Sequence, residues 1–165
     1  MAFHLAQVNI GRLAAPLDSE QLQPFVERLL SVNAIADASP GFVWRLQTED
    51  GDATAYRVFD SVDTIVNLSV WESLEALRDY VYRLPEHVEI LRRRREFFVR
   101  SDEASVALWW TPAGSLPTVA EAEERLTLLR AVGPSPDAFT FKRFFPPPDE
   151  APVSVDDDRE LCPAP

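Results

Sequence analysis

The sequence contains little cysteine, glycine and histidine, and each shortage excludes a class of chemistry. A single cysteine, Cys162, rules out an intramolecular disulfide and a metal site built from several thiolates. The five glycines form neither a GxGxxG motif nor a P-loop, which disfavours nucleotide binding. The two histidines form no HxH or HxxxH pattern, so we predict no dedicated metal site. The lack of a GxSxG motif argues against nucleophilic hydrolysis.

Positive charge is also scarce. The 16 Lys and Arg residues against 27 Asp and Glu residues give a net charge of -11. This charge disfavours nucleic acids, whose phosphates need basic partners, and anionic membrane surfaces, which attract clusters of Lys and Arg. No apolar run approaches the ~20 residues of a membrane-spanning helix. The start of the sequence has no basic region followed by a continuous apolar segment, so we expect no signal peptide and a cytoplasmic protein.

The apolar pattern predicts one domain, at residues 1–145, followed by a tail. The chain has 165 residues, of which 46% are hydrophobic, enough for a single core. Residues 146–165 are rich in proline and acidic side chains and cannot bury a core of their own. We therefore predict that they form a disordered or surface-draped tail.

Within the domain, the periodicity predicts five strands and four helices. The strands are expected at residues 3–10, 42–47, 65–71, 104–110 and 139–145, with 55–59 as a short strand or an extended loop. The helices are expected from a cap at Asp18 or Ser19 to about residue 38, from Ser73 to 84, from Pro85 to 98, and after a cap at Thr118. The first part of this order matches the ferredoxin-like plan, an α+β fold whose antiparallel sheet carries helices on one face.

The strand at residues 65–71 has two different faces. Val66, Leu68 and Val70 form an apolar face, which the helices would leave bare. The economical way to bury it is to pack it against a second copy, so we predict a homodimer. The other face, with Asn67 and Trp71, is mixed in polarity and is predicted to line something less apolar than a core.

Several motifs resemble known families. The segment WESLEALRDYVYRLPEH resembles the dimeric α/β-barrel superfamily that includes antibiotic-biosynthesis monooxygenases and haem-degrading monooxygenases. VNIGRL, SPGFVWRLQ, VNLSVWES, ILRRRREFF and ALWWTPAG are more closely similar to a bacterial domain-of-unknown-function family within that superfamily, over residues 3 to 145. The resemblance implies a ferredoxin-like monomer and a dimer built sheet to sheet, forming a dimeric α/β barrel. It implies no settled activity, because a fold does not fix a function.

The haem-degrading branch uses an Asn on the first strand, a Trp on the helix after the third strand, and a later His. Asn9 matches the first of these residues, but Tyr80 stands in place of the Trp. His87 lies earlier than the haem-ligating histidine would. The set is not reproduced, so we expect no cofactor and keep haem binding through His87 as the weaker alternative.

The candidate site residues lie on these predicted strands and helices. We expect a pocket lined by Asn9, Asn67, Trp71, Tyr80 and His87, with contributions from Trp44 and Arg94. A histidine at the start of a helix is expected to be neutral, because a positive charge there opposes the helix dipole. The arginine run 92–95 can be a solvated helix face. It wraps around the helix, however, so Arg94 or Arg95 could instead hold a substrate carboxylate.

These features predict a protein that binds a small apolar or aromatic molecule. If it is an enzyme, we expect monooxygenase-like, cofactor-independent oxygenation or proton transfer on an aromatic or polyketide-like substrate. His87 would be the general acid or base, and Asn9 or Asn67 would orient an oxyanion. The alternative is a non-catalytic ligand-binding or structural dimer in which these residues only satisfy buried backbone groups. The sequence leaves the substrate open, and also whether His87 lines a pocket or satisfies a turn.

Overall fold

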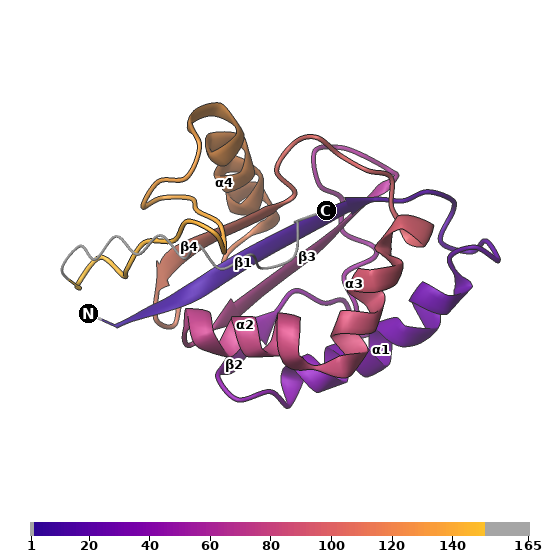
Figure 1. Ribbon diagram of the computed structural model, residues 1–165, viewed down its shortest axis with the longest axis horizontal. Coiled ribbons are helices and arrows are strands. Elements are labelled where there is room, and N and C mark those ends of the chain that lie inside the picture. Colours follow the sequence, from indigo (N-terminus) through magenta and orange to yellow (C-terminus); the bar gives the residue numbers. More distant parts are fainter. Residues whose placement is uncertain (1, 151–165) are drawn as a thin grey trace.

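The computed structural model describes residues 2–150 and contains one four-stranded antiparallel sheet in the order β2-β3-β1-β4 (Figure 1). The elements are β1 (Phe3–Arg12), α1 (Gln23–Asp37), β2 (Phe42–Arg45), β3 (Thr64–Trp71), α2 (Leu74–Arg83), α3 (Pro85–Phe97), β4 (Val106–Pro112) and α4 (Val119–Val132). The α+β, ferredoxin-like prediction is confirmed. Most of the predicted tail, residues 151–165, lies outside the described residues, as does Cys162.

The central strand β1 pairs with β3 on one side and with β4 on the other, antiparallel in both cases. Ala6 lies between Val70 and Trp109 in this register. Because strand side chains alternate, Ala6 and Val8 face one side of the sheet, while Leu5, Gln7 and Asn9 face the other. We call these two sides the α4 face and the pocket face.

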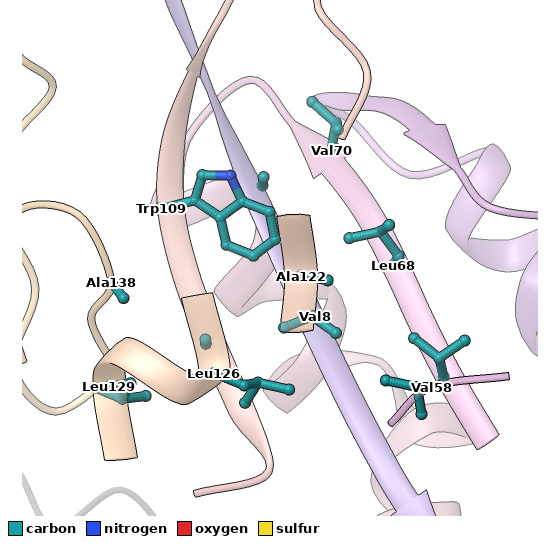
Figure 2. Close-up of a cluster of buried hydrophobic side chains, with 12 residues drawn as sticks. Val8, Val58, Leu68, Val70, Trp109, Ala122, Leu126, Leu129 and Ala138 are labelled. Carbon is teal, nitrogen blue, oxygen red and sulfur yellow. The ribbon is translucent and has the colours of Figure 1, made fainter. Parts of the chain in front are cut away.

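The α4 face carries the largest cluster of buried apolar side chains (Figure 2). From the sheet it includes Ala6, Val8, Val66, Leu68, Val70, Ala107 and Trp109, which pack against Ala122, Leu126 and Leu129 of α4. The Trp109 indole Nε1 donates a hydrogen bond of 3.0 Å to the carboxylate of Glu121, so the ring is fixed at its polar end as well. The helix α4 therefore docks through a stripe of small and apolar residues at four- and three-residue spacing.

The expectation of a bare sheet face was wrong. Val66, Leu68 and Val70 are only 4%, 1% and 0% exposed within a single chain, because α4 and neighbouring loops cover them. Figure 1 shows α4 on one side of the sheet and α1, α2 and α3 on the other. The homodimer stays a prediction, but the reason given for it from the sequence does not hold.

The pocket face is covered by the first three helices. Leu5, Trp71 and Leu108 pack with Leu74 and Leu77 of α2 in a second buried cluster. At the other end of the face, Phe25 of α1 contacts the rings of Phe97 and Phe98, with centroids 5.6 and 5.2 Å apart. The Ser73 side chain caps α2 by accepting a bond from the Ala76 amide, and Pro85 begins α3, both as predicted.

Two predicted local features were wrong. The helix α1 begins at Gln23 without a side-chain cap, and Ser19 instead bonds the carbonyl of Pro16 in the preceding turn. Residues 139–145 do not form a strand. Phe139 exchanges two backbone hydrogen bonds with Leu108 (2.8 and 2.9 Å), after which the chain turns, with the Thr140 amide bonded to the Arg143 carbonyl. The alternation of aromatic residues here reflects packing under α2, not strand pairing.

The burial of the α4 face can be tested at Leu126, which is 0% exposed. We expect Leu126→Ala to lower the free energy of unfolding by about 2–5 kcal/mol, because it leaves a cavity in a sealed cluster. Leu30→Ala is the matched control, since Leu30 is 59% exposed on α1 and should change stability by less than about 0.5 kcal/mol. Urea denaturation gives both values. Equal, small losses would show that α4 does not seal the sheet.

Candidate functional site

A cavity of about 760 Å³ opens between the pocket face of the sheet and the helices α1 and α3. Its floor is formed by the end of β1 and by the beginning and middle of β3. Its apolar walls include Phe25, Leu29 and Val32 of α1 and Ile90 and Leu91 of α3. A volume of this size can hold a molecule of several fused rings. The less apolar face predicted for β3 is the floor of this cavity.

Two asparagines lie side by side on the floor. Asn9 and Asn67 are directly paired across β1 and β3, which places their Cβ atoms about 5 Å apart. Asn67 is exposed although it lies in the middle of a sheet strand, because the cavity is above it. Within residues 2–150 neither side chain has a hydrogen-bond partner. Both amides therefore offer their donors and acceptors to whatever fills the cavity.

The next polar residues on the same face are satisfied within the protein. The Ser69 hydroxyl donates to Gln7 Oε1 at 2.9 Å, and the Trp71 indole Nε1 donates to Ser69 Oγ at 3.0 Å. Trp71 is fully buried and stacks on Tyr80, with centroids 5.1 Å apart. Trp71 therefore lies behind Tyr80 and does not line the cavity, contrary to the prediction.

Trp44 lies on the wrong face for a site residue. The pairing of β2 with β3 contains a bulge between Phe42 and Trp44, so that Phe42 opposes Trp71 while Trp44 opposes Val70. The extra residue turns Trp44 to the α4 face, where it packs against the buried cluster. Simple alternation from Phe42 would have kept the two aromatic residues on one face. The predicted pocket role of Trp44 was therefore wrong.

Tyr80 and His87 form one wall of the cavity. Their ring centroids are 4.8 Å apart and the ring planes are inclined by 55°. The Tyr80 hydroxyl donates to the carbonyl of Val32 at 3.3 Å, which joins α2 to α1. Burial raises the pKa of Tyr80 far above its ordinary value, with a smaller lowering by Arg45 and a smaller raising by Asp37. The phenol is thus a neutral wall and an anchor.

His87, which lines the cavity, has one nitrogen held by the protein and one that no group of the described residues binds. Its Nδ1 lies 3.0 Å from the Val81 carbonyl oxygen, and a carbonyl can only accept, so Nδ1 carries the proton. Nε2 has no partner within residues 2–150 and is not sealed from solvent. Burial lowers the pKa of His87, partly opposed by the Val81 hydrogen bond. At neutral pH the ring is therefore uncharged, with the lone pair of Nε2 available to accept a proton.

The arginine run divides between solvent and cavity. Arg94 and Arg95 line the cavity, whereas Arg92 is exposed elsewhere and Arg93 binds the Glu96 carboxylate at 2.8 Å. The sequence left open which arginine faces inward: Arg94 lies half-buried beside the cavity, and Arg95 borders it with an exposed side chain. Three further arginines that the sequence did not single out also line the cavity: Arg12, Arg100 and Arg130. They come from separate segments, so no local pattern indicates that they meet.

Metal-binding groups and membrane spans were searched for among the described residues. No group of three or more His, Cys, Asp or Glu side chains within residues 2–150 is placed to hold a metal ion. Over the same residues, none of the helices has the length and apolar character needed to cross a membrane.

The lowered pKa of His87 predicts a pH dependence of stability. Between the folded pKa and the unfolded value of 6.5, the unfolded chain binds the proton more readily. The stability contributed by neutral His87 is therefore complete above pH 6.5 and is lost as the pH falls from 6.5 through the folded pKa. We expect His87→Gln to flatten this part of the profile, measured by urea denaturation at a series of pH values. An unchanged slope in the variant would contradict the burial of His87.

Comparisons with solved structures return proteins of similar chain course but low identity. A conserved protein from Methanosarcina mazei is 14% identical, with a TM-score of 0.48, and the match covers 65% of this chain and 91% of that one. SnoaB, a cofactor-independent oxygenase from Streptomyces nogalater, is 20% identical, with a TM-score of 0.46 and coverage of 71% and 100%. A putative antibiotic biosynthesis monooxygenase from Chloroflexus aurantiacus is 16% identical, with a TM-score of 0.44 and coverage of 69% and 97%. We transfer no residue role from these proteins.

A search of curated proteins gives no match. A family match, by contrast, covers nearly all of the described chain, from residue 4 to residue 155. It agrees with the sequence motifs that predicted a domain-of-unknown-function family. The chain belongs to the family described as Domain of unknown function (DUF3291).

Proposed function

We propose that the cavity binds a small, flat molecule with an acidic C–H or O–H group and that His87 removes this proton. The observation that supports this most directly is the composition of one cavity. It joins an uncharged imidazole with an open Nε2 to two unpartnered amides on the floor, Asn9 and Asn67. Polar groups buried only for the sake of the fold are usually bonded within the protein, whereas these groups are left to solvent or to a ligand.

Each residue has a distinct role in the proposed proton transfer. Nε2 of His87 accepts the proton, while the Nδ1–H group continues to donate its hydrogen bond to the Val81 carbonyl. This hydrogen bond orients the ring and stabilises the imidazolium that forms. The substrate becomes an enolate or phenolate whose oxygen gains negative charge. The amide N–H groups of Asn9 and Asn67 would donate to that oxygen. Once a ligand fills the cavity against the apolar walls from α1 and α3, water would be displaced from these groups, which strengthens the interactions.

A carbanion formed in this way can react with molecular oxygen without a cofactor. A ring methylene that loses two hydrogens and gains a carbonyl oxygen, with the second oxygen atom leaving as water, balances with O₂ as the sole co-reactant. The electrons come from the substrate itself. The proposed enzyme is therefore a proton-transfer catalyst whose product depends on whether oxygen reaches the carbanion.

His87→Gln tests the assigned base. A panel of enolisable aromatic ketones and polycyclic phenols is first screened by thermal shift. We then expect wild-type protein to exchange the acidic proton of a bound compound for deuterium, and His87→Gln to slow this exchange by about 10²–10⁴-fold at pH 7. Exchange is followed by NMR, and oxygen uptake by an electrode.

The other histidine provides the matched control. His4 does not line the cavity, so His4→Gln should exchange at the wild-type rate. If His87→Gln binds and exchanges like the wild type, His87 is not the base. Binding without exchange in any variant, wild type included, would favour the non-catalytic ligand-binding alternative.

Haem is a second candidate, and one observation favours it. A metal-bound histidine commonly donates its other N–H to a backbone carbonyl, which is the arrangement of Nδ1 and Val81. His87 would then hold the iron, and the bound haem would supply the redox chemistry. Haemin titration distinguishes the candidates: haem binding requires a Soret band that His87→Ala removes. No shifted band in the wild type would eliminate haem as a ligand.

A further inference from the structure

The cavity has a strongly basic end in an otherwise acidic protein. Its lining cations are Arg12, Arg94, Arg95, Arg100 and Arg130, against the two acidic residues Asp102 and Glu103. The whole chain, in contrast, has a net charge of -11. The distribution of charge along the cavity therefore calls for a local explanation.

Not all of these arginines are available to a ligand. Arg130 binds Glu103 at 3.3 Å, donates to the Ala104 carbonyl at 3.0 Å and lies over the Phe59 ring. Arg94 donates to the Leu91 carbonyl of its own helix at 3.2 Å. These two side chains are at least partly committed to the protein.

The other three are not committed. Within residues 2–150, the side chains of Arg12, Arg95 and Arg100 make no hydrogen bond or ion pair. Elsewhere in the chain, Arg45 and Arg93 each hold a carboxylate, at 2.7 and 2.8 Å. All three are exposed, as are Arg57 and Arg92, which also lack a partner among the described residues, so the absence of a bond does not single them out. What distinguishes them is that they gather at one end of one cavity, and such a concentration of positive charge in an acidic chain favours a ligand that brings its own negative charge.

The unpaired arginines lie where β1 and α3 end together. The Val99 amide donates to the Arg12 carbonyl at 2.9 Å, and the Ala14 amide donates to the Phe97 carbonyl at 2.8 Å. Arg12, Arg95 and Arg100 are therefore close in the fold. The C-terminus of a helix also favours cations, which accounts for Arg95 but not for Arg12 on a strand or Arg100 beyond the helix.

The basic end is separated from the proposed reactive end by a definite distance. Asn9 and Arg12 are three residues apart on β1, about 10 Å along the strand, and their side chains leave opposite faces of the sheet, so Arg12 borders the cavity at the end of the strand and not on the floor beside Asn9. His87 and Arg94 are seven residues apart on α3, which also corresponds to about 10 Å. The start of α3 lies at the Trp71 end of the sheet, through Tyr80, and its end lies at the Arg12 end. The helix thus sets the spacing between the two ends of the cavity.

We infer that the ligand is an aromatic acid: a flat apolar body with a carboxylate held at the basic end by Arg12, Arg95 and Arg100, and with the group that His87 deprotonates at the other end, about 10 Å away along α3. The guanidinium fork suits the two oxygens of a carboxylate. This inference rests on the proposed function and names the substrate class for the same cavity. It also orients the substrate, with its charged end toward the junction of β1 and α3.

A pair of dyes tests the inference. 8-Anilinonaphthalene-1-sulfonate is a flat anion, and N-phenyl-1-naphthylamine has the same rings without the charge. We expect the double variant Arg12→Gln/Arg95→Gln to lower the affinity for the anionic dye by about tenfold or more. Its affinity for the neutral dye should stay within about twofold of the wild-type value. Fluorescence titration at constant ionic strength measures both. The control Arg57→Gln/Arg92→Gln removes the same charge from arginines that do not line the cavity, and should leave both affinities unchanged.

The possible failures are distinguishable. The inferred carboxylate site is overturned if both double variants lower the affinity for the anionic dye equally. It is also overturned if the affinity for the neutral dye falls as much as that for the anionic dye. In either case, binding of the dyes in the cavity is still supported. Leu29→Trp, which fills the cavity from its α1 wall, shows whether the dyes bind there. If neither dye binds the wild type, or if both bind Leu29→Trp undiminished, the proposed function fails together with the inference.

Discussion

The alternation of side chains along β1 is the constraint on which the rest of the structure depends. Because β1 is hydrogen-bonded on both edges, its residues can face only the two sides of the sheet. One side, with Ala6 and Val8, is sealed by α4 into a dry cluster that anchors the sheet. The other side is free to differ along its length, since three helices cover it unevenly. A site can be built there without weakening the cluster on the α4 face.

The pocket face changes character over a few residues. At the Trp71 end, helix α2 closes the face, and the polar groups of Gln7 and Ser69 are bonded to each other. One step further along the strands, Asn9 and Asn67 have no such partners and lie under the cavity. The groups bonded within the protein hold the structure, whereas the two asparagines are left to solvent or to a ligand. This transition, together with the open nitrogen of His87, is the physical basis of the proposed proton transfer.

Much of this arrangement could be predicted from the sequence, because it follows from local periodicity. The mixed face of β3 indicated a polar lining, and the cavity does contain Asn9, Asn67, Tyr80, His87 and Arg94. The misplacements come from non-local effects. A bulge places Trp44 on the α4 face. Trp71 is buried behind Tyr80, where its indole is hydrogen-bonded to Ser69. The sequence of α4 also does not indicate which face of the sheet this helix covers. The gathering of Arg12, Arg95 and Arg100 likewise depends on how β1 and α3 meet.

The most direct test of the account is the stability of Asn67→Leu compared with Ser69→Ala. Asn67 has no partner within residues 2–150, so the account predicts that Asn67→Leu leaves the free energy of unfolding unchanged or higher, while ligand binding is lost. Ser69→Ala breaks a buried network and should cost about 1–3 kcal/mol. A loss of about 1 kcal/mol or more in Asn67→Leu would contradict the account, because it would show that the amide serves the fold and not a ligand.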